Sequence, residues 1–321
     1  MTQPLSYGTI LIMERIEISV VVPVFNEEKS VQALTQKLRE TLSRTGKTFE
    51  IILVDDGSTD KTREIIRTLR ARSILLNRNY GQFTAMATGI RKAHGEIVVT
   101  MDGDLENDPE DILKLIGKLG EGFDVVCGWR KNRWEGEFFT RRIPSLAANK
   151  FISWVTGVYL NDYGCNMKAY RRQILERLEL GIYMQRMIAA YASKEGAKVT
   201  EIPIGFKPRP FGKSNYGLLR TFRVFFDVIT FHFFYKYGRR PMHFFGAVGF
   251  WSFFMAFLLF GWMVYLKFIK YADFIKTPLP VLIGIFIMVG FQFILMGLLA
   301  ELIIRHTPRE VEYYEEINGE K

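Results

Sequence analysis

Cysteine and histidine are scarce in this chain, which has two cysteines and four histidines in 321 residues. Cys127 and Cys165 form no C-x-x-C pair, so neither a zinc site nor a disulfide framework is expected, and a reducing compartment fits.

Acidic residues are fewer than basic ones. The chain has 34 Asp and Glu and 43 Lys and Arg, which gives a formal net charge of +9. This excess favours phosphorylated substrates or anionic lipid headgroups. Nucleic acid is not an expected partner, since no recognition motif is present.

Several common ligand-binding signatures are missing. No G-x-G-x-x-G follows the first apolar strand and no G-x-x-x-x-G-K-[ST] occurs, which excludes a dinucleotide fingerprint and a P-loop. Residues 102–113 are not an EF-hand loop, because Asn107 replaces the required glycine and Leu113 the required glutamate. The N-terminal apolar run is short and lacks basic residues before it, so it is not a signal peptide. Residues 1–15 are expected to form an N-terminal extension.

Residues 16–216 alternate between strand and helix patterns. Runs of apolar, often β-branched residues predict strands at 16–25, 49–56, 73–78, 96–103 and 123–130. Amphipathic patterns predict helices at 26–46, 56–72, 82–95 and 108–122. This alternation indicates an α/β fold with a doubly wound, mostly parallel, Rossmann-like sheet. Ligands bind beyond the carboxyl ends of such strands. The segments expected to line that crevice are Pro23–Glu28, Asp55–Asp60, Asp102–Glu106 and Gly128–Arg130.

Two pairs of acidic residues stand at predicted strand ends. Asp102 and Asp104 are one residue apart, so they can share one divalent cation, which is what a diphosphate leaving group needs. Asp55 and Asp56 begin an Asp-Asp-Gly-Ser segment, where turn formation is as good an explanation as ligand binding. The first pair therefore predicts chemistry on a phosphorylated donor, and the second leaves both interpretations open.

The last third of the chain is dominated by apolar residues. Phe244–Leu266 and Thr277–Ala300 contain no charged residue, and at about 1.5 Å per residue each can cross the roughly 30 Å hydrocarbon core of a bilayer. We therefore predict two transmembrane helices within 241–306, with two buried core helices as the alternative. Residues 217–240 show an amphipathic pattern typical of juxtamembrane helices in the interface, or of a helix packed under the catalytic domain.

The distribution of positive charge predicts the orientation in the membrane. An even number of spans places the catalytic domain, residues 16–216, and the tail, residues 307–321, on one side. Basic residues beside the spans are more numerous on that side. They are Lys236, Arg239, Arg240, Arg305 and Arg309, against Lys267, Lys270 and Lys276 in the connecting loop. The expected location is therefore the inner or plasma membrane, with the catalytic domain and the tail in the cytoplasm.

Five segments in register carry a resemblance to a known family. VVPVFNEE, LVDDGSTD, MDGDLENDPED, CGWR and PRPFGKSNYG together resemble family 2 glycosyltransferases of the GT-A fold. With the two apolar segments, the chain is similar to polyprenyl-phosphate glycosyltransferases of the dolichol-phosphate mannose synthase-like branch. SILLNRNYGQ and NDYGCNMKAYRR are particularly similar to the bacterial undecaprenyl-phosphate formamido-arabinose transferases.

The resemblance implies an activity and its partners. The family moves a sugar, with inversion, from a nucleoside diphosphate sugar to undecaprenyl or dolichyl phosphate at a membrane, for cell-envelope glycan or lipid modification. A UDP-sugar follows from the bacterial branch, Mg²⁺ or Mn²⁺ would be the cofactor, and a homo-oligomer, a tetramer, is a candidate assembly.

The resemblance also assigns roles to individual residues. Nucleotide binding falls to Pro23, Phe25, Glu27, Val54, Asp56, Asp102, Gly103, Arg209 and Lys213. The metal would be held by Asp102, Asp104 and Glu106. Asp104 and Arg130 would be catalytic, with Arg130 between the donor and acceptor phosphates. Arg130, Arg141 and Ser145 would bind the acceptor phosphate.

The chain departs from the family pattern at three positions. Gly103 replaces an alanine, and Glu106 replaces a glutamine and adds negative charge beside the metal. Asn215 stands where the family places a lysine, and Lys213 stands two residues earlier. Whether Lys213 takes over that role is left open.

Two other functions share these features. A processive polysaccharide synthase has the same fold and metal pair, but its Gln-x-x-Arg-Trp signature is not met, since Arg130 precedes Arg133-Trp134 where glutamine should stand. A non-catalytic membrane scaffold would not need the intact Asp102-x-Asp104 pair and Arg130. The sequence therefore favours the transferase.

Overall fold

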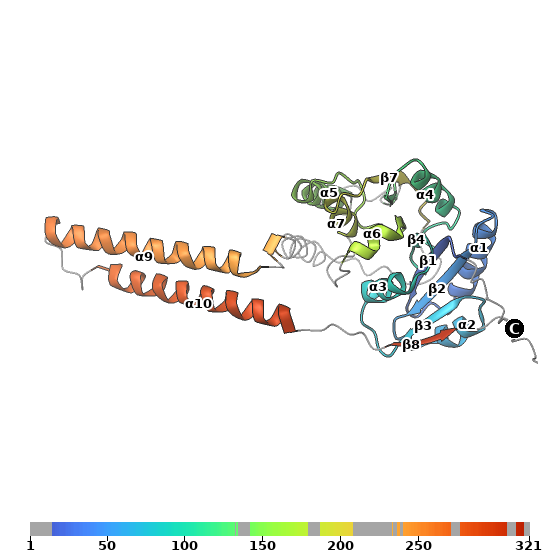
Figure 1. The fold of residues 1–321 in the computed structure, drawn as a ribbon, viewed down its shortest axis with the longest axis horizontal. Helices are drawn as coiled ribbons and strands as arrows, with labels where there is room; N and C mark the ends of the chain where they lie inside the picture. The colour runs from blue at the N-terminus through green and yellow to red at the C-terminus, as the bar shows by residue number, and fades with distance from the viewer. Residues whose placement is uncertain are drawn as a thin grey trace, which may run out of the picture. The chain divides into compact units, whose positions relative to one another are not determined.

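The computed structural model describes residues 15–131, 133, 142–178, 187–207, 233, 236–237, 240–270, 277–306 and 313–317. The chain divides into two compact units, residues 1–228 with 311–321, and residues 229–310 (Figure 1). Most of the predicted amphipathic segment 217–240 lies outside the described residues. So does nearly all of the N-terminal extension.

The first unit is built on a single mixed sheet of eight strands in the order β7-β5-β6-β4-β1-β2-β3-β8. Strands β6 and β8 run antiparallel to their neighbours, and the other described pairings are parallel. The mostly parallel sheet predicted from the sequence is thus confirmed. The strand bounds are β1 Ile18–Val24, β2 Phe49–Asp55, β3 Arg72–Leu76, β4 Ile97–Thr100, β5 Val125–Trp129, β6 Lys168–Arg171, β7 Val199–Pro203 and β8 Tyr313–Ile317.

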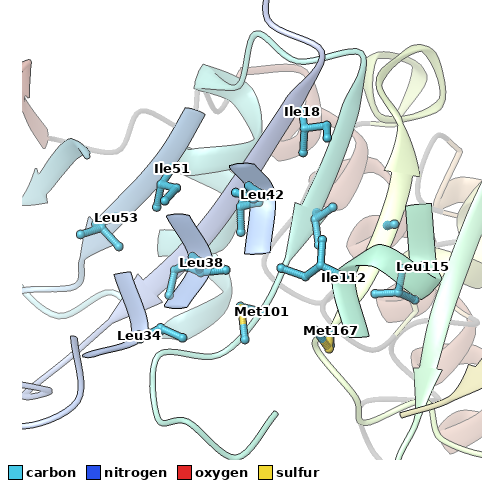
Figure 2. Packing of buried hydrophobic residues seen from close by; sticks show 14 of the residues in the cluster. Ile18, Leu34, Leu38, Leu42, Ile51, Leu53, Met101, Ile112, Leu115 and Met167 are labelled. Atoms are coloured by element: carbon cyan, nitrogen blue, oxygen red, sulfur yellow. The ribbon is translucent and has the colours of Figure 1, made fainter. Parts of the chain in front are cut away.

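Helices cover both faces of this sheet. Apolar residues of α1, α2 and α4 form one core with β1 and β2, and Leu34, Leu38 and Leu42 of α1 face Ile51 and Leu53 (Figure 2). Helix α3 packs closely on the other face, because a Cβ at Gly89 would collide with the side chains of Val21 and Val54. The helix bounds are α1 Val31–Ser43, α2 Thr62–Thr68, α3 Gln82–Lys92, α4 Asp111–Gly120, α5 Ile143–Thr156, α6 Arg172–Arg177 and α7 Ile188–Lys194.

Three of the four predicted helices begin later than the sequence pattern predicts, and α3 begins at Gln82 as predicted. Helix α1 was expected from residue 26 and begins at Val31, and α2 was expected from residue 56 and begins at Thr62. In the second case Asp60 accepts a hydrogen bond from the backbone N of Thr62 (2.9 Å), which holds the preceding residues in a turn. The residues freed from the helices form loops at the carboxyl ends of β1 and β2.

Three strands have no counterpart in the sequence prediction. The segments of β6, β7 and β8 are four or five residues long and rich in polar residues, so no apolar run marks them. Strand β6 lies between β4 and β5, and β8 pairs with β3 from Arg72↔Ile317 to Leu76↔Tyr313. The segment expected to be only a tail therefore adds an edge strand to the sheet.

The second unit contains two long apolar helices, α9 (Met242–Lys270) and α10 (Leu279–His306). Both are long and apolar enough to cross a membrane, and only 17% and 11% of their most apolar windows are buried. They are therefore not buried core helices. Small residues bring them together, since Gly249 lies against the backbone of Gly290 and the Ser252 hydroxyl donates to the carbonyl O of Phe286 (2.8 Å). Close approach at small residues is typical of membrane helix pairs.

Candidate active site

A pocket of about 240 Å³ lies beyond the carboxyl ends of β1, β2 and β4. Its lining comprises Pro23, Val24, Phe25, Glu27, Asp56, Asn79, Gly81, Gln82, Asp102, Gly103 and Asp104. The structure therefore brings together six of the predicted nucleotide-binding residues and Asp104. Val54 is fully buried in β2 with its side chain facing α3, so that side chain does not reach the pocket. Arg209 and Lys213 lie outside the described residues.

The first two loops of this pocket are held together by hydrogen bonds. Asn26 has a φ of 56°, a left-handed conformation that asparagine tolerates better than most residues. Its backbone N donates to the Ser58 hydroxyl (2.9 Å), and its side-chain oxygen accepts from the backbone N of Thr59 (2.9 Å). The loops after β1 and β2 therefore form one connected rim.

The two adjacent carboxylates Asp55 and Asp56 have different surroundings. Asp55 is fully buried and accepts from the backbone N of Ser58 (3.1 Å) and from Arg63 Nε (2.6 Å), so it stabilises the turn. Asp56 lines the pocket and accepts from the backbone N of Tyr80 (2.8 Å) and of Gly81 (2.9 Å). Burial raises the pKa of Asp56, and these two hydrogen bonds oppose the rise. Asp55 thus fits the turn interpretation, and ligand binding by Asp56, which lines the pocket, stays a prediction.

Gly57 allows the second and third loops to meet. Its φ is +75°, and a Cβ there would lie 2.5 Å from the backbone N of Asn79.

We expect Gly57→Ala to separate the loops, to disturb the contacts of Asp56 and to weaken nucleotide binding roughly tenfold or more. Isothermal titration with nucleoside diphosphate would measure this. Gly46→Ala is the matched control, because Gly46 has a φ of +66° with open space around it. It should cost only about 1–2 kcal/mol of backbone strain and leave binding unchanged, and equal loss of binding in both variants would contradict this account.

Asp102 and Asp104 are nearly buried, at 9% and 7% exposure. Oδ1 of Asp102 accepts from Gln82 Nε2 (2.5 Å) and from Asn166 Nδ2 (2.8 Å), so two amides orient this carboxylate. Oδ1 of Asp104 accepts from the backbone N of Glu106 (3.1 Å). Leu105 between them has a φ of 61°, a costly conformation for leucine that turns the loop sharply. Asp102 is thus held at the pocket by residues far away in the chain, and Asp104 by its own loop.

The two aspartates fit a divalent cation. Within the described part of the chain, no group of three carboxylate, histidine or cysteine side chains is arranged to hold a metal ion, and Glu106 does not line the pocket. Its place among the ligands stays a prediction. Mg²⁺ commonly uses one or two carboxylates and takes its other ligands from substrate phosphates and water. Asp102 and Asp104 provide such a pair.

A second pocket of about 450 Å³ contains Arg130. Arg130 is 5% exposed and paired with Asp162 through two bonds, Nε to Oδ2 (2.7 Å) and Nη2 to Oδ1 (3.0 Å). Burial by itself would raise the pKa of Asp162, but the Arg130 guanidinium holds it below the ordinary value. The guanidinium is therefore charged and fixed in direction at the wall of the pocket.

The same pocket is rich in positive charge. Its remaining lining is Trp129, Lys131, Arg133, Arg142, Ser145, Leu146, Asn149 and Asn161. Of the predicted acceptor residues, the structure brings Arg130 and Ser145 together, and Arg141 lies outside the described residues. Arg142, the next residue, lines the pocket instead. Four cationic side chains around one carboxylate suit an anionic ligand.

Sequence reasoning missed three residues that organise the two pockets. Asp162 and Asn166 belong to one short segment, and Asp162 lines the second pocket while Asn166 holds Asp102 of the first. Gln82 holds Asp102 from the start of α3. All three residues belong to the segments NDYGCNMKAYRR and SILLNRNYGQ. The similarity of these segments to one branch of the family was the only sequence feature that could have pointed to them.

Comparison with known proteins identifies the family. The profile of glycosyl transferase family 2 matches residues 19–179. The dodecaprenyl-phosphate galacturonate synthase of Rhizobium johnstonii is 39% identical over 93% of this chain and 90% of its own length. The undecaprenyl-phosphate 4-deoxy-4-formamido-L-arabinose transferase of Aeromonas hydrophila is 34% identical over 91% of both chains.

A solved structure supports the same fold. Glucosyl-3-phosphoglycerate synthase from Mycobacterium tuberculosis, in complex with Mn²⁺, UDP and phosphoglyceric acid, superposes with a TM-score of 0.54. The match covers 67% of this chain and 78% of that one at 20% identity, so it bears on the fold alone. The fold and the family predicted from the sequence are both confirmed. The chain belongs to glycosyltransferase family 2.

Proposed function

We propose that this protein transfers a sugar from a nucleoside diphosphate sugar to the phosphate of a polyprenyl lipid. The observation that carries the proposal is the pairing of two pockets by residues 162–166. One pocket presents two aspartates, and the other is lined by Arg130 and three more cationic side chains. Transfer to a polyprenyl phosphate is also what the names of the two relatives describe for those proteins.

The first pocket suits the donor. Phe25 is 43% exposed at its mouth and can contact a base, and Asp56 can accept a hydrogen bond from it. We propose a uridine nucleotide, in line with the UDP bound by the related mycobacterial fold. Asp102 and Asp104 would hold Mg²⁺ or Mn²⁺ beside the diphosphate. Such an ion, when bound, offsets the negative charge that develops on the leaving diphosphate.

The second pocket suits the acceptor phosphate. A phosphate monoester has a second pKa near ~6, so it is largely ionised at neutral pH and needs no general base. Its oxygen would form a bond to the anomeric carbon while the bond from that carbon to the diphosphate oxygen breaks, which inverts the configuration. Arg130 would stabilise the phosphates without reorganising, because Asp162 already fixes its direction.

The second unit and β8 support a location at the membrane with the catalytic unit in the cytoplasm. A polyprenyl lipid resides in the bilayer, and α9 and α10 are long enough to cross it. Strand β8 follows α10 in the chain and pairs with β3 of the catalytic sheet. This pairing supports an even number of membrane crossings between β7 and β8, because both strands belong to one sheet. We propose two spans, with the catalytic unit on the cytoplasmic side where nucleotide sugars are made.

The test is an assay of the purified full-length chain with undecaprenyl phosphate and a panel of UDP- and GDP-sugars. We expect one donor to release its nucleoside diphosphate and to produce a lipid that carries a single sugar. A lipid product that grows by repeated additions would indicate a processive synthase instead. Absence of nucleoside diphosphate release with every donor would indicate a scaffold.

Arg142 should affect use of the acceptor rather than the donor. Loss of a charge-assisted contact to phosphate costs about 1.5–3 kcal/mol, so Arg142→Ala should raise the KM for lipid phosphate roughly ten- to a hundredfold. The Kd for nucleotide should stay unchanged. Arg141→Ala is the comparison, because the resemblance to the family assigned the acceptor phosphate to Arg141. A larger effect of Arg141→Ala would support the assignment made from the sequence over the one made from the pocket.

A further inference from the structure

Residues 157–167, which connect α5 to β6, form part of the wall of the second pocket. This segment supplies Asn161 and Asp162 to the lining and belongs to no helix or strand. Asp162 fixes the Arg130 guanidinium through two bonds, so the place of the segment decides where the guanidinium points. Because the segment lacks the hydrogen bonds of regular secondary structure, its position depends on contacts from other elements.

Glu201 of β7 makes such a contact. Its Oε2 accepts from the backbone N of Asn161 (2.8 Å), and its Oε1 accepts from Asn161 Nδ2. The backbone N–H of Asp162 also stabilises the charge of this carboxylate. On the other side, Asn149 Nδ2 of α5 donates to the carbonyl O of Asn161 (2.6 Å). Glu201 is thus a contact that reaches both Asn161 and Asp162.

The strand that carries Glu201 is tied to the strand that leads to Arg130. Strand β7 pairs with β5 in parallel, with Glu201 opposite Cys127 and Pro203 opposite Trp129, the residue before Arg130. The backbone N of Ile204 then donates to the carbonyl O of Trp129 (2.9 Å). Both partners of the Arg130–Asp162 pair are therefore held from the same pair of strands, Arg130 by the chain itself and Asp162 through Glu201.

The donors around Glu201 suit a carboxylate. An ionised carboxylate has two oxygens and no proton of its own, whereas an amide would set its NH₂ group against an N–H donor. Burial raises the pKa of Glu201, and the hydrogen bonds from Asn161 and Asp162 oppose the rise. Glu201 lines neither pocket, so it acts on a bound ligand only through the segment that it holds.

We propose that Glu201 is a positioning residue of the second pocket, which holds Asn161 and Asp162 in the place from which Asp162 aims Arg130 at the acceptor. That the acceptor is a lipid phosphate rests on the function proposed above. A displacement of about 1 Å at a reacting centre can cost about a hundredfold in rate. Loss of this contact therefore impairs transfer although Glu201 touches no substrate.

Reaction of Arg130 with phenylglyoxal in the full-length protein tests the positioning without catalysis. Arg130 is 5% exposed and paired, so in the wild type it should react slowly. Glu201→Gln should raise the rate of its modification, followed by mass spectrometry of the peptide, roughly tenfold, the scale of one hydrogen bond to a charged group.

Ile202→Val is the matched control on the same strand. The Ile202 side chain packs against the hydrophobic core on the opposite face of the sheet, so this change lowers stability without touching the segment. It should leave the reactivity of Arg130 unchanged. The same increase in both variants would show a general loosening of β7 and would overturn the proposal.

Steady-state kinetics connect the contact to the reaction. Glu201→Gln should lower kcat/KM for undecaprenyl phosphate roughly tenfold. The Kd for nucleoside diphosphate should stay unchanged, because neither Asn161 nor Asp162 lines the first pocket. In an Asp162→Asn background, Glu201→Gln should change kcat/KM by less than about twofold, since residues that act through one another are not additive. A merely structural role predicts losses that multiply.

The outcomes separate this proposal from the proposed function. Unchanged reactivity of Arg130 in Glu201→Gln would overturn the positioning role, as would multiplied losses in the double variant or a kcat/KM equal to that of the wild type. Because the modification reads the Arg130–Asp162 pair without catalysis, faster modification in a chain that transfers no sugar would overturn only the function.

Discussion

Asp104→Asn should lower the rate of sugar transfer at least about a hundredfold, the scale expected when one group that stabilises charge in a transition state is removed. Asp104 lines the first pocket beside Asp102 and is almost buried, so an amide there removes negative charge that a cation requires. The fold should persist, because the amide oxygen can still accept the hydrogen bond from Glu106 N. Nucleoside diphosphate release and the unfolding midpoint measure the two effects.

Asp108→Asn is the matched control for this variant. Asp108 belongs to the same loop, but it pairs with Lys207 (2.9 Å) and does not line the pocket. Its replacement should leave transfer within about twofold of the wild type, since a partly exposed ion pair contributes at most about 1 kcal/mol. Full activity of Asp104→Asn in the presence of excess chelator would end the metal hypothesis.

Asp162→Asn should destabilise the protein by about 3–5 kcal/mol, because it leaves the buried Arg130 cation without its counter-ion. The same change should impair transfer, since Arg130 loses the two bonds that fix its direction. Urea unfolding followed by near-ultraviolet circular dichroism gives the first quantity, and acceptor kcat/KM gives the second.

A double variant separates stability from chemistry at this pair. Arg130→Met with Asp162→Leu replaces a buried ion pair by apolar groups of similar size, which is often neutral or stabilising. We expect stability to recover to near the wild-type value while transfer remains lost. Recovery of activity together with stability would show that Arg130 serves the fold and not the reaction.

The acid dependence of this stability has a defined sign. The folded-state pKa of Asp162 is lowered, so the contribution of the ion pair is complete above the unfolded-state pKa of about 4 and is lost as pH falls through the folded value. The stability difference between wild type and Asp162→Asn should therefore be constant near neutral pH and shrink in acid. A difference that grew in acid would contradict the assignment.

Much of this protein could be predicted from local sequence. The sequences of β1, β2 and β4 are runs of apolar residues, because a strand that is buried on both faces of a sheet needs apolar side chains on both. In a parallel sheet the residues that follow such strands meet at one edge, so Pro23, Asp56 and Asp102 could be placed in one pocket before the fold was known. Helices α9 and α10 could also be predicted from local sequence, because each contains a long run without charged residues.

Tertiary structure decided the rest, because the deciding contacts join residues far apart in the chain. Strand β8 has no apolar run, and it is a strand only because the edge of β3 offers it hydrogen bonds. Arg130 pairs with Asp162, and Asp102 pairs with Gln82 and Asn166. The periodic pattern of apolar residues in the sequence gives no sign of these contacts. Arg142, the residue before α5, lines the second pocket because of how that helix packs. Sequence by itself determined which residue types stand at the strand ends, through burial and backbone geometry, and packing decided which of their side chains meet.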